Sequence, residues 1–191
     1  MLVSEGVGWK AHAHVDKFDP DQTRWVRARS GLHAPQHRDF TALRVAPSDA
    51  ADWAGNLLVT AGLTRLVSLL LGAGGQAATN TSARLGAGNG AGTAVVGDTD
   101  LGAAAGAANR WFQIMDATFP SAAAAVATFK ATFASADGNF AWNEWGIDIG
   151  TPTVASSAVV SATLLNHKTS AALGTKSSGS TWAFTATITE S

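Results

Sequence analysis

Glu144 is the residue whose surroundings in the sequence come closest to those of a catalytic group. It lies between Trp142 and Trp145, and burial beside indole rings would raise its pKa, as a general acid requires. The sequence supplies no plausible set of catalytic partners, and His167 has no evident partner. A buried carboxylate then needs a structural donor. We expect an arginine in that role, Arg84 or Arg110, and we expect no enzymatic activity.

His12 and His14 lie two residues apart on one face of an expected strand, and Asp16 continues that face. Two imidazoles at this spacing can share a metal ion. The sequence provides no obvious fourth ligand. We therefore expect an exposed polar strand face and no metal site.

Asp98 and Asp100 flank Thr99 as a pair of carboxylates. Such pairs can bind calcium or act as acid and base. The surrounding sequence lacks the regular Asp/Asn/Gly spacing of a calcium loop. We expect a loop that caps the next segment.

The glycine-rich run at residues 86–92 suggests a phosphate-binding loop. It has neither the Gly-Lys-Ser/Thr of a P-loop nor a GxGxxG that opens a helix. A flexible turn between strands fits better, so we expect no cofactor.

Low charge favours a protein that works in an assembly. Of the 191 residues, 46% are hydrophobic and 14% charged, with a net charge of -1, whereas soluble domains carry roughly 25% charged residues. Little repulsion would keep copies apart, so we expect a homo-oligomer; an ordinary alanine-rich monomer is the alternative. The chain has no cysteine, which excludes disulfides and thiolate chemistry.

The longest apolar run, Leu57 to Leu71, is interrupted by polar residues, so no membrane span is expected. The first 16 residues carry no long apolar run, so no signal peptide is expected.

Residues 1–54 are expected to form an N-terminal hairpin and an extended arm. Residues 7–18 alternate as a strand, Asp19-Pro20-Asp21 indicates a turn, 23–29 could pair with the strand, and 30–47 are polar with two prolines. Such arms often become ordered on a neighbouring protein. Basic residues here could touch nucleic acid, but the near-neutral charge balance disfavours it. The candidates for partner contacts in this arm are Trp25, Arg27, Arg29 and Phe40.

Residues 55–191 are expected to form a β-sandwich domain with one packed helix. Leucines recur at helical spacing over residues 56–71, Asn56 is a plausible N-cap, and glycines at 72–75 end the helix. Short alternating segments bounded by turn residues predict a mainly β, sandwich-like fold. The expected strands are 81–85, 110–119, 125–134, 140–149, 159–169 and 182–190.

The strand expected at residues 140–149 carries large aromatics on both faces. Strict alternation would point Trp142 and Glu144 one way and Trp145 the other. Such a strand is covered on both sides. The candidate core or interface residues are Trp142, Glu144, Trp145, Arg84, Arg110 and Trp111.

Five segments together resemble a family of small structural proteins of tailed bacteriophages, over about residues 55–191. The segments lie at residues 56–66, 83–90, 109–113, 140–148 and 165–168. A weaker similarity is to the N-terminal module of phage tail-collar fibres, although Asn89 stands where that module usually has Asp.

The resemblance implies a virion component assembled in the host bacterial cytoplasm. We expect a minor capsid or capsid decoration protein that contacts the major capsid protein. A tail, baseplate or fibre component is the alternative within this class. A receptor module that binds host glycans on exposed tryptophans is the alternative outside it.

Overall fold

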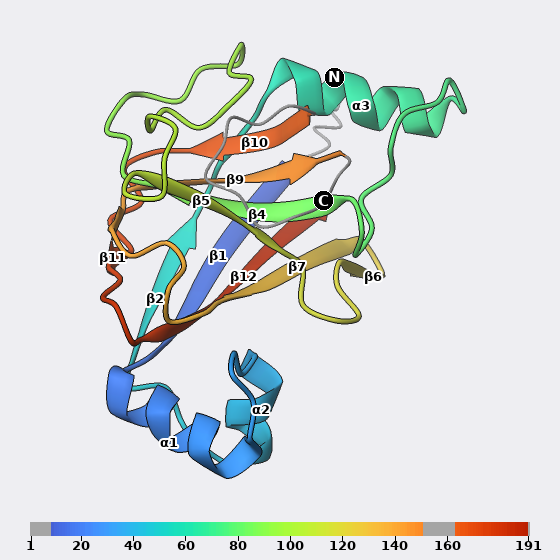
Figure 1. The fold of residues 1–191 in the computed structure, drawn as a ribbon. Coiled ribbons are helices and arrows are strands. Elements are labelled where there is room, and N and C mark those ends of the chain that lie inside the picture. The colour runs from blue at the N-terminus through green and yellow to red at the C-terminus, as the bar shows by residue number, and fades with distance from the viewer. Residues whose placement is uncertain (1–8, 151–162, 191) are drawn as a thin grey trace, which may run out of the picture.

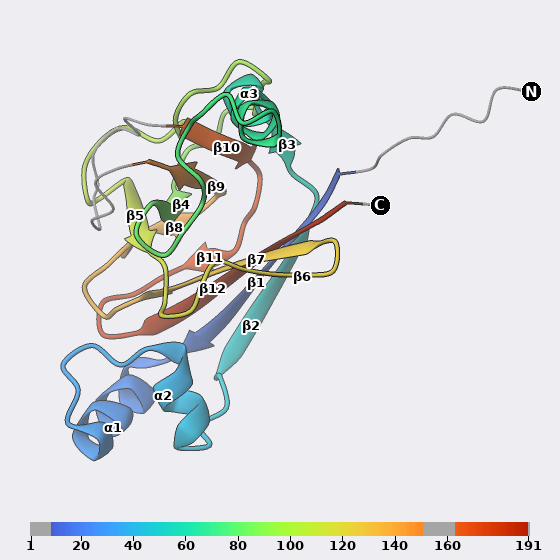
Figure 2. The same cartoon turned by 90° about the vertical axis from the view of Figure 1, so that its right-hand side faces the viewer.

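Two five-stranded antiparallel sheets form the body of the protein in a computed structural model, which describes residues 9–150 and 163–190 (Figures 1 and 2). The predicted mainly β, sandwich-like fold is therefore confirmed. Sheet A has the order β2 (Asp49–Ala54), β1 (Trp9–Phe18), β12 (Thr181–Glu190), β7 (Val126–Phe133) and β6 (Ser121–Ala123). Sheet B has the order β3 (Leu57–Leu58), β10 (Thr163–Lys168), β9 (Glu144–Ile149), β4 (Ala83–Gly88) and β5 (Arg110–Ile114). A short pair, β8 (Ala141–Trp142) with β11 (Gly174–Thr175), adds a third sheet.

The core lies between the two sheets and is built by alternation along their strands. In β1, Ala11, Ala13 and Val15 are buried, and the residues between them are less so. Strand β12 pairs with β1 over its whole length and contributes Phe184 and Ile188 to the same core. Period-two burial of this kind is what one covered sheet face requires.

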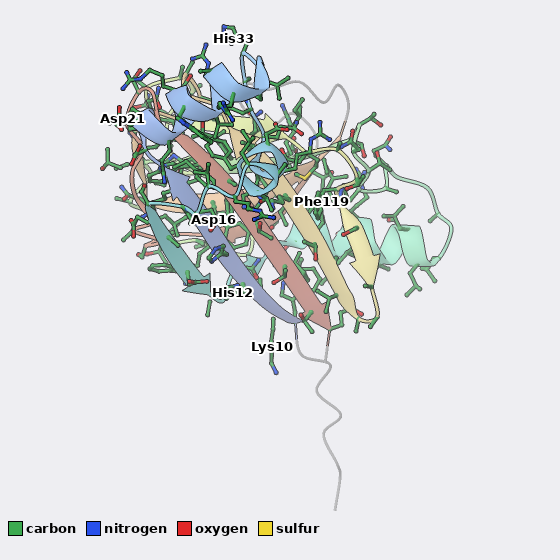
Figure 3. All side chains as sticks on the ribbon, turned by 90° about the horizontal axis from the view of Figure 1, so that it is seen from below. Lys10, His12, Asp16, Asp21, His33 and Phe119 are labelled. Atoms are coloured by element: carbon green, nitrogen blue, oxygen red, sulfur yellow. The ribbon has the colours of Figure 1, made fainter. Side chains whose placement is uncertain are left out.

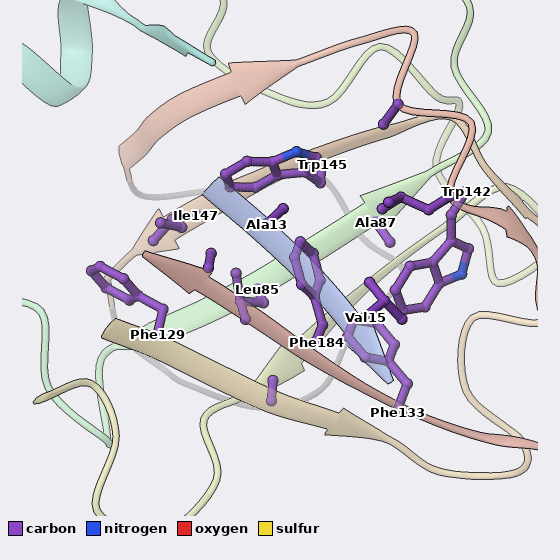
Figure 4. Close-up of a cluster of buried hydrophobic side chains, with 14 of the residues drawn as sticks. Ala13, Val15, Leu85, Ala87, Phe129, Phe133, Trp142, Trp145, Ile147 and Phe184 are labelled. Atoms are coloured by element: carbon purple, nitrogen blue, oxygen red, sulfur yellow. The ribbon is translucent and has the colours of Figure 1, made fainter. Parts of the chain in front are cut away.

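Trp142 and Trp145 both point into this core (Figure 4). The ring of Phe184 lies 5.9 Å from Trp142 and 5.5 Å from Trp145, centroid to centroid. The prediction that the two indoles occupy opposite faces is wrong, because the chain leaves β8 at Asn143 and enters β9 in another sheet. Every residue of β9 is buried, so the expectation of a strand covered on both sides is confirmed.

Helix α3 (Thr60–Leu70) packs on β10 of sheet B, at the end of the molecule farthest from the other helices (Figure 1). It begins four residues later than predicted, because residues 57–58 pair with β10 as strand β3. Asn56 is not its N-cap; the Asn56 amide oxygen accepts from the indole of Trp9 at 3.1 Å. Gly62 lies against the backbone of Leu165, where a Cβ atom would come within 2.7 Å of the Leu165 Cα.

Residues 20–30 form helix α1 (Pro20–Ser30), so the strand predicted at 23–29 is wrong. Asp19 accepts from the amide of Gln22, and the Gln22 side chain accepts from the amide of Asp19. This capping box, with Pro20 in the first turn, starts a helix where the sequence suggested only a turn. The strand that pairs with β1 is β2 instead.

The segment between α1 and β2 includes a second helix, α2 (His37–Ala42). Phe40 of α2 is fully buried and stacks on Phe18 at 3.9 Å between ring centroids. Its expected role in partner contacts is therefore wrong. Residues 9–54 are two strands of sheet A with a helical cover, not a separate hairpin and arm; residues 1–8 lie outside the described part.

Candidate functional site

The outer face of sheet B is covered by the loop that joins β4 to β5, residues 89–109, here called the β4–β5 loop. Its ends meet where the amide of Asn89 donates to the carbonyl of Asn109 at 2.8 Å. Gly86 and Gly88 lie in β4 itself, so the predicted turn begins only after Gly88. A Cβ at Gly88 would collide with the carboxylate of Glu144. Glycine at this position is therefore explained by close packing.

The carboxylate of Glu144 binds this loop to the sheet. Glu144 is fully buried. Its oxygens accept from the backbone amides of Gly102 at 2.8 Å, Ala103 at 2.7 Å and Gly90 at 3.2 Å. Two sections of the loop, twelve residues apart, thus converge on one side chain.

His167 of β10 supplies a fourth contact to Glu144. Its Nε2 lies 2.8 Å from Glu144 Oε2, and its Nδ1 lies 2.6 Å from Asp98 Oδ2 in the β4–β5 loop. Because carboxylates only accept, each contact requires an N–H on the ring, which suits the protonated imidazolium. We call these three residues, Asp98, His167 and Glu144, the histidine clamp.

The pKa values in the clamp follow from burial opposed by hydrogen bonding. Burial alone would raise the pKa of Glu144, but the bonds from His167, Gly102 and Ala103 outweigh it and lower the pKa. Burial would likewise lower the pKa of His167, but its bonds to Glu144 and Asp98 raise it. Both shifts favour the charged forms and a stable ion pair.

The expected pairing of Glu144 with an arginine is wrong. The guanidinium of Arg84 binds Asp148, with Nε 2.8 Å from Asp148 Oδ2. That of Arg110 binds Asp100, with Nη1 2.7 Å from Asp100 Oδ2. Both arginines are buried. They bind other carboxylates, one in strand β9 and one in the β4–β5 loop.

Chemically, the clamp is suited to holding a loop in place. A cleft of about 320 Å³ borders His167, yet both ring nitrogens are already bonded to carboxylates. Glu144 accepts four hydrogen bonds, and a general base needs a free lone pair directed at its substrate. The two carboxylates pair with the imidazole rather than with each other.

His12 and His14 lie on the outer face of sheet A, where β1 also carries Asp16 (Figure 3). His12 Nε2 and His14 Nδ1 both approach Asp52 Oδ1, at 3.2 Å and 2.9 Å. His14 Nε2 also lies 3.1 Å from Asp16 Oδ1. Within residues 9–150 and 163–190, no group of three or more His, Asp or Glu residues is arranged to hold a metal ion.

The remaining candidates are scattered. Trp25 on α1 is 47% exposed, and the Arg29 guanidinium lies 5.8 Å from its ring centroid. Trp111 on β5 is half-buried and donates from its indole to Gln113 at 2.8 Å. Arg27 lies in the last turn of α1. The structure does not bring these residues into one site with the clamp.

The largest feature that the sequence analysis missed is an apolar surface on α3. The helix was expected to bury one face on a sheet, yet it also leaves large aliphatic side chains in solvent, of which Leu70 is 85% exposed. A groove of about 470 Å³ runs beside the helix, lined mainly by apolar side chains that include Trp9 and Leu58. The exposed side chains, here called the α3 surface, are Leu63, Val67, Leu69, Leu70 and Leu71. A helix that is apolar on more than one face was the signal in the sequence.

Comparison with protein families, curated protein sequences and solved structures finds no match for this chain. No helix in the described part of the chain is long and apolar enough to cross a membrane.

Proposed function

We propose that this protein is a structural component of a tailed-phage virion, a minor capsid or decoration protein that binds other virion proteins and its own copies. The α3 surface is the observation that carries the assembly role. Large contiguous apolar patches on a folded protein mark interaction sites. This one lies on a chain with 14% charged residues, which has little charge to oppose association.

The histidine clamp supports the structural part of the proposal. Its buried glutamate and buried histidine hold the β4–β5 loop against sheet B through hydrogen bonds. With Arg84–Asp148 and Arg110–Asp100 nearby, three buried or partly buried ion pairs lie on one face of the sandwich. A rigid, pre-shaped outer face loses little entropy when it joins a lattice.

The identity of the particle rests on the resemblance of residues 55–191 to phage structural proteins. A tail, baseplate or fibre location is the alternative within the same class. Glycan binding through exposed tryptophans has weaker support, because among the tryptophans in the described residues only Trp25 is classed as exposed.

Addition of the purified protein to preformed capsids of the phage that encodes it tests the proposal. We expect binding that saturates at a copy number matching a class of lattice positions. The matched comparison is Leu70→Glu with Leu32→Glu, which place the same charge on exposed leucines of α3 and of the chain just after α1. Saturable binding to tails alone would support the tail alternative, and binding to neither would contradict the proposal.

A further inference from the structure

We infer that the α3 surface is the contact between two copies of this chain, which pack their α3 helices antiparallel about a two-fold axis near Val67. This inference rests on the proposed function in taking the chain to be an assembly protein, and it adds the partner and the geometry. A two-fold contact uses the same patch on both copies.

Helix α3, which carries this surface, is held in place by contacts within its own chain. Its inner side meets β10 at Gly62, where the backbone of Leu165 leaves no room for a side chain. Arg65 anchors the same helix, because its guanidinium donates to the carbonyl of Gln76 at 2.9 Å and to the hydroxyl of Thr163 at 2.8 Å. The outward side chains are thus held in a fixed arrangement before any partner arrives.

The charge on α3 favours a second copy as its partner. The helix contains no acidic residue, and its one charged residue is Arg65, whose guanidinium is bound within the same chain. The two α3 helices can therefore meet without like charges on them opposing each other, and Glu190 lines the adjoining groove. A charged partner would find no opposite charge on the helix to pair with.

The spacing of the outward residues suits a helix pair. Leu63, Val67, Leu70 and Leu71 follow the i, i+4, i+7, i+8 pattern of one helical stripe. In an antiparallel pair centred on Val67, Leu63 of one copy meets Leu70 or Leu71 of the other. Axes about 8–10 Å apart, with Cα atoms about 2.3 Å from each axis, leave the two Val67 Cα atoms about 3.4–5.4 Å apart.

The area is sufficient for a modest dimer. Leu69 lies off this stripe. From their exposed fractions, the other four side chains of the α3 surface leave about 450 Å² of surface in solvent per copy, so two copies would bury about 900 Å², close to the roughly 1,000 Å² of a specific interface. The adjoining groove beside Trp9 and Leu58 would add to this.

Site-directed crosslinking tests the inference on the purified full-length chain. The sequence contains no cysteine, so Val67→Cys introduces a single thiol. A disulfide requires Cα atoms about 4.4–6.8 Å apart, which the two-fold position provides. We expect Val67→Cys to oxidise to a covalent dimer, and Leu32→Cys, of similar exposure at 43% against 46%, to stay mostly monomeric. Equal crosslinking of the two variants would overturn the inference.

Sedimentation equilibrium completes the test. We expect the parent to sediment as a dimer of the 19.5 kDa chain, Leu70→Glu as a monomer that remains folded, and Leu32→Glu as the parent does. A monomeric parent, or a dimer that survives Leu70→Glu, overturns the inference. A lower melting temperature for Leu70→Glu, with the same sedimenting mass as the parent, also overturns it. Leu70 would then pack against its own copy of the chain and not against a second copy. A dimer in solution that fails to bind virions would contradict the proposed function and leave this inference standing.

Discussion

Glu144 and His167, 23 residues apart in the chain, meet through a 2.8 Å hydrogen bond on the outer face of sheet B. Strands β9 and β10 are antiparallel neighbours in which His167 pairs with Gly146. Glu144 lies two residues from Gly146 on the same face, so the two side chains meet diagonally. This bond joins the sheet to the β4–β5 loop, because each side chain also binds that loop.

Glu144→Ala should destabilise the protein by about 3–5 kcal/mol, since removal of one partner leaves the other buried and uncompensated. Glu144→Gln should cost less, because its side-chain oxygen can still accept from the amides of Gly102 and Ala103. Urea unfolding measures both. The control is Glu190→Gln at an exposed position, with a change within about 0.5 kcal/mol. A Glu144→Ala variant as stable as the parent would refute the clamp.

The clamp should make stability depend on pH at both ends of the mildly acidic range. The lowered pKa of Glu144 stabilises the fold above its unfolded value near 4.5, and this is lost as pH falls through the folded pKa. The raised pKa of His167 stabilises the fold below its unfolded value near 6.5, and this is lost as pH rises through the folded pKa. The stability difference between the parent and His167→Gln should therefore be largest between about pH 4.5 and 6.5. A difference independent of pH would contradict the charged pair.

Gly62→Ala should destabilise the protein by at least about 2 kcal/mol, because overpacking against backbone cannot be relieved by a side-chain rotation. The Leu165 backbone occupies the space that the new Cβ needs. Thermal unfolding with Gly92→Ala as control measures the effect, since a Cβ at Gly92 meets nothing within 4 Å. Equal melting temperatures for the two variants would mean that α3 sits less tightly on β10.

Lys176 should make stability rise with pH between about 8 and 10.5. Burial lowers its pKa to about 8 from an ordinary value of 10.5, while its ammonium donates to the carbonyl of Ala134 and to the side chain of Asn139. In that window the unfolded chain binds more protons, so the free energy of unfolding increases by up to about 1.4 kcal/mol per pH unit. The rise should be absent from Lys176→Met in matched urea titrations. An identical rise in that variant would show that other titrating groups cause the pH dependence.

Alternation and turn residues were enough to predict most of the strands. Strand β12 begins one residue before its predicted start and ends where predicted, and β7 agrees within one residue at each end. These strands have one covered face, so burial imposes a period of two that the sequence displays. The passage of the chain from one sheet to another at Asn143 has no such signature in the sequence. Because of it, Trp145 points into the same core as Trp142 and not to the opposite face.

The clamp could not be predicted in the same way. Asp98 and His167 lie 69 residues apart, and only the pairing of β9 with β10 and the path of the β4–β5 loop bring them together. Helix α1, by contrast, had a signal in the sequence. Asp19 and Gln22 are spaced as a capping box around Pro20, but Asp-Pro-Asp was interpreted as a turn.

The copy number of this protein in purified virions, measured by quantitative mass spectrometry on heads separated from tails, tests the proposed function most directly. We predict that it is found with the heads, in a number that matches a class of capsid lattice positions. Its absence from both heads and tails would contradict the central claim that this is a structural protein of the particle.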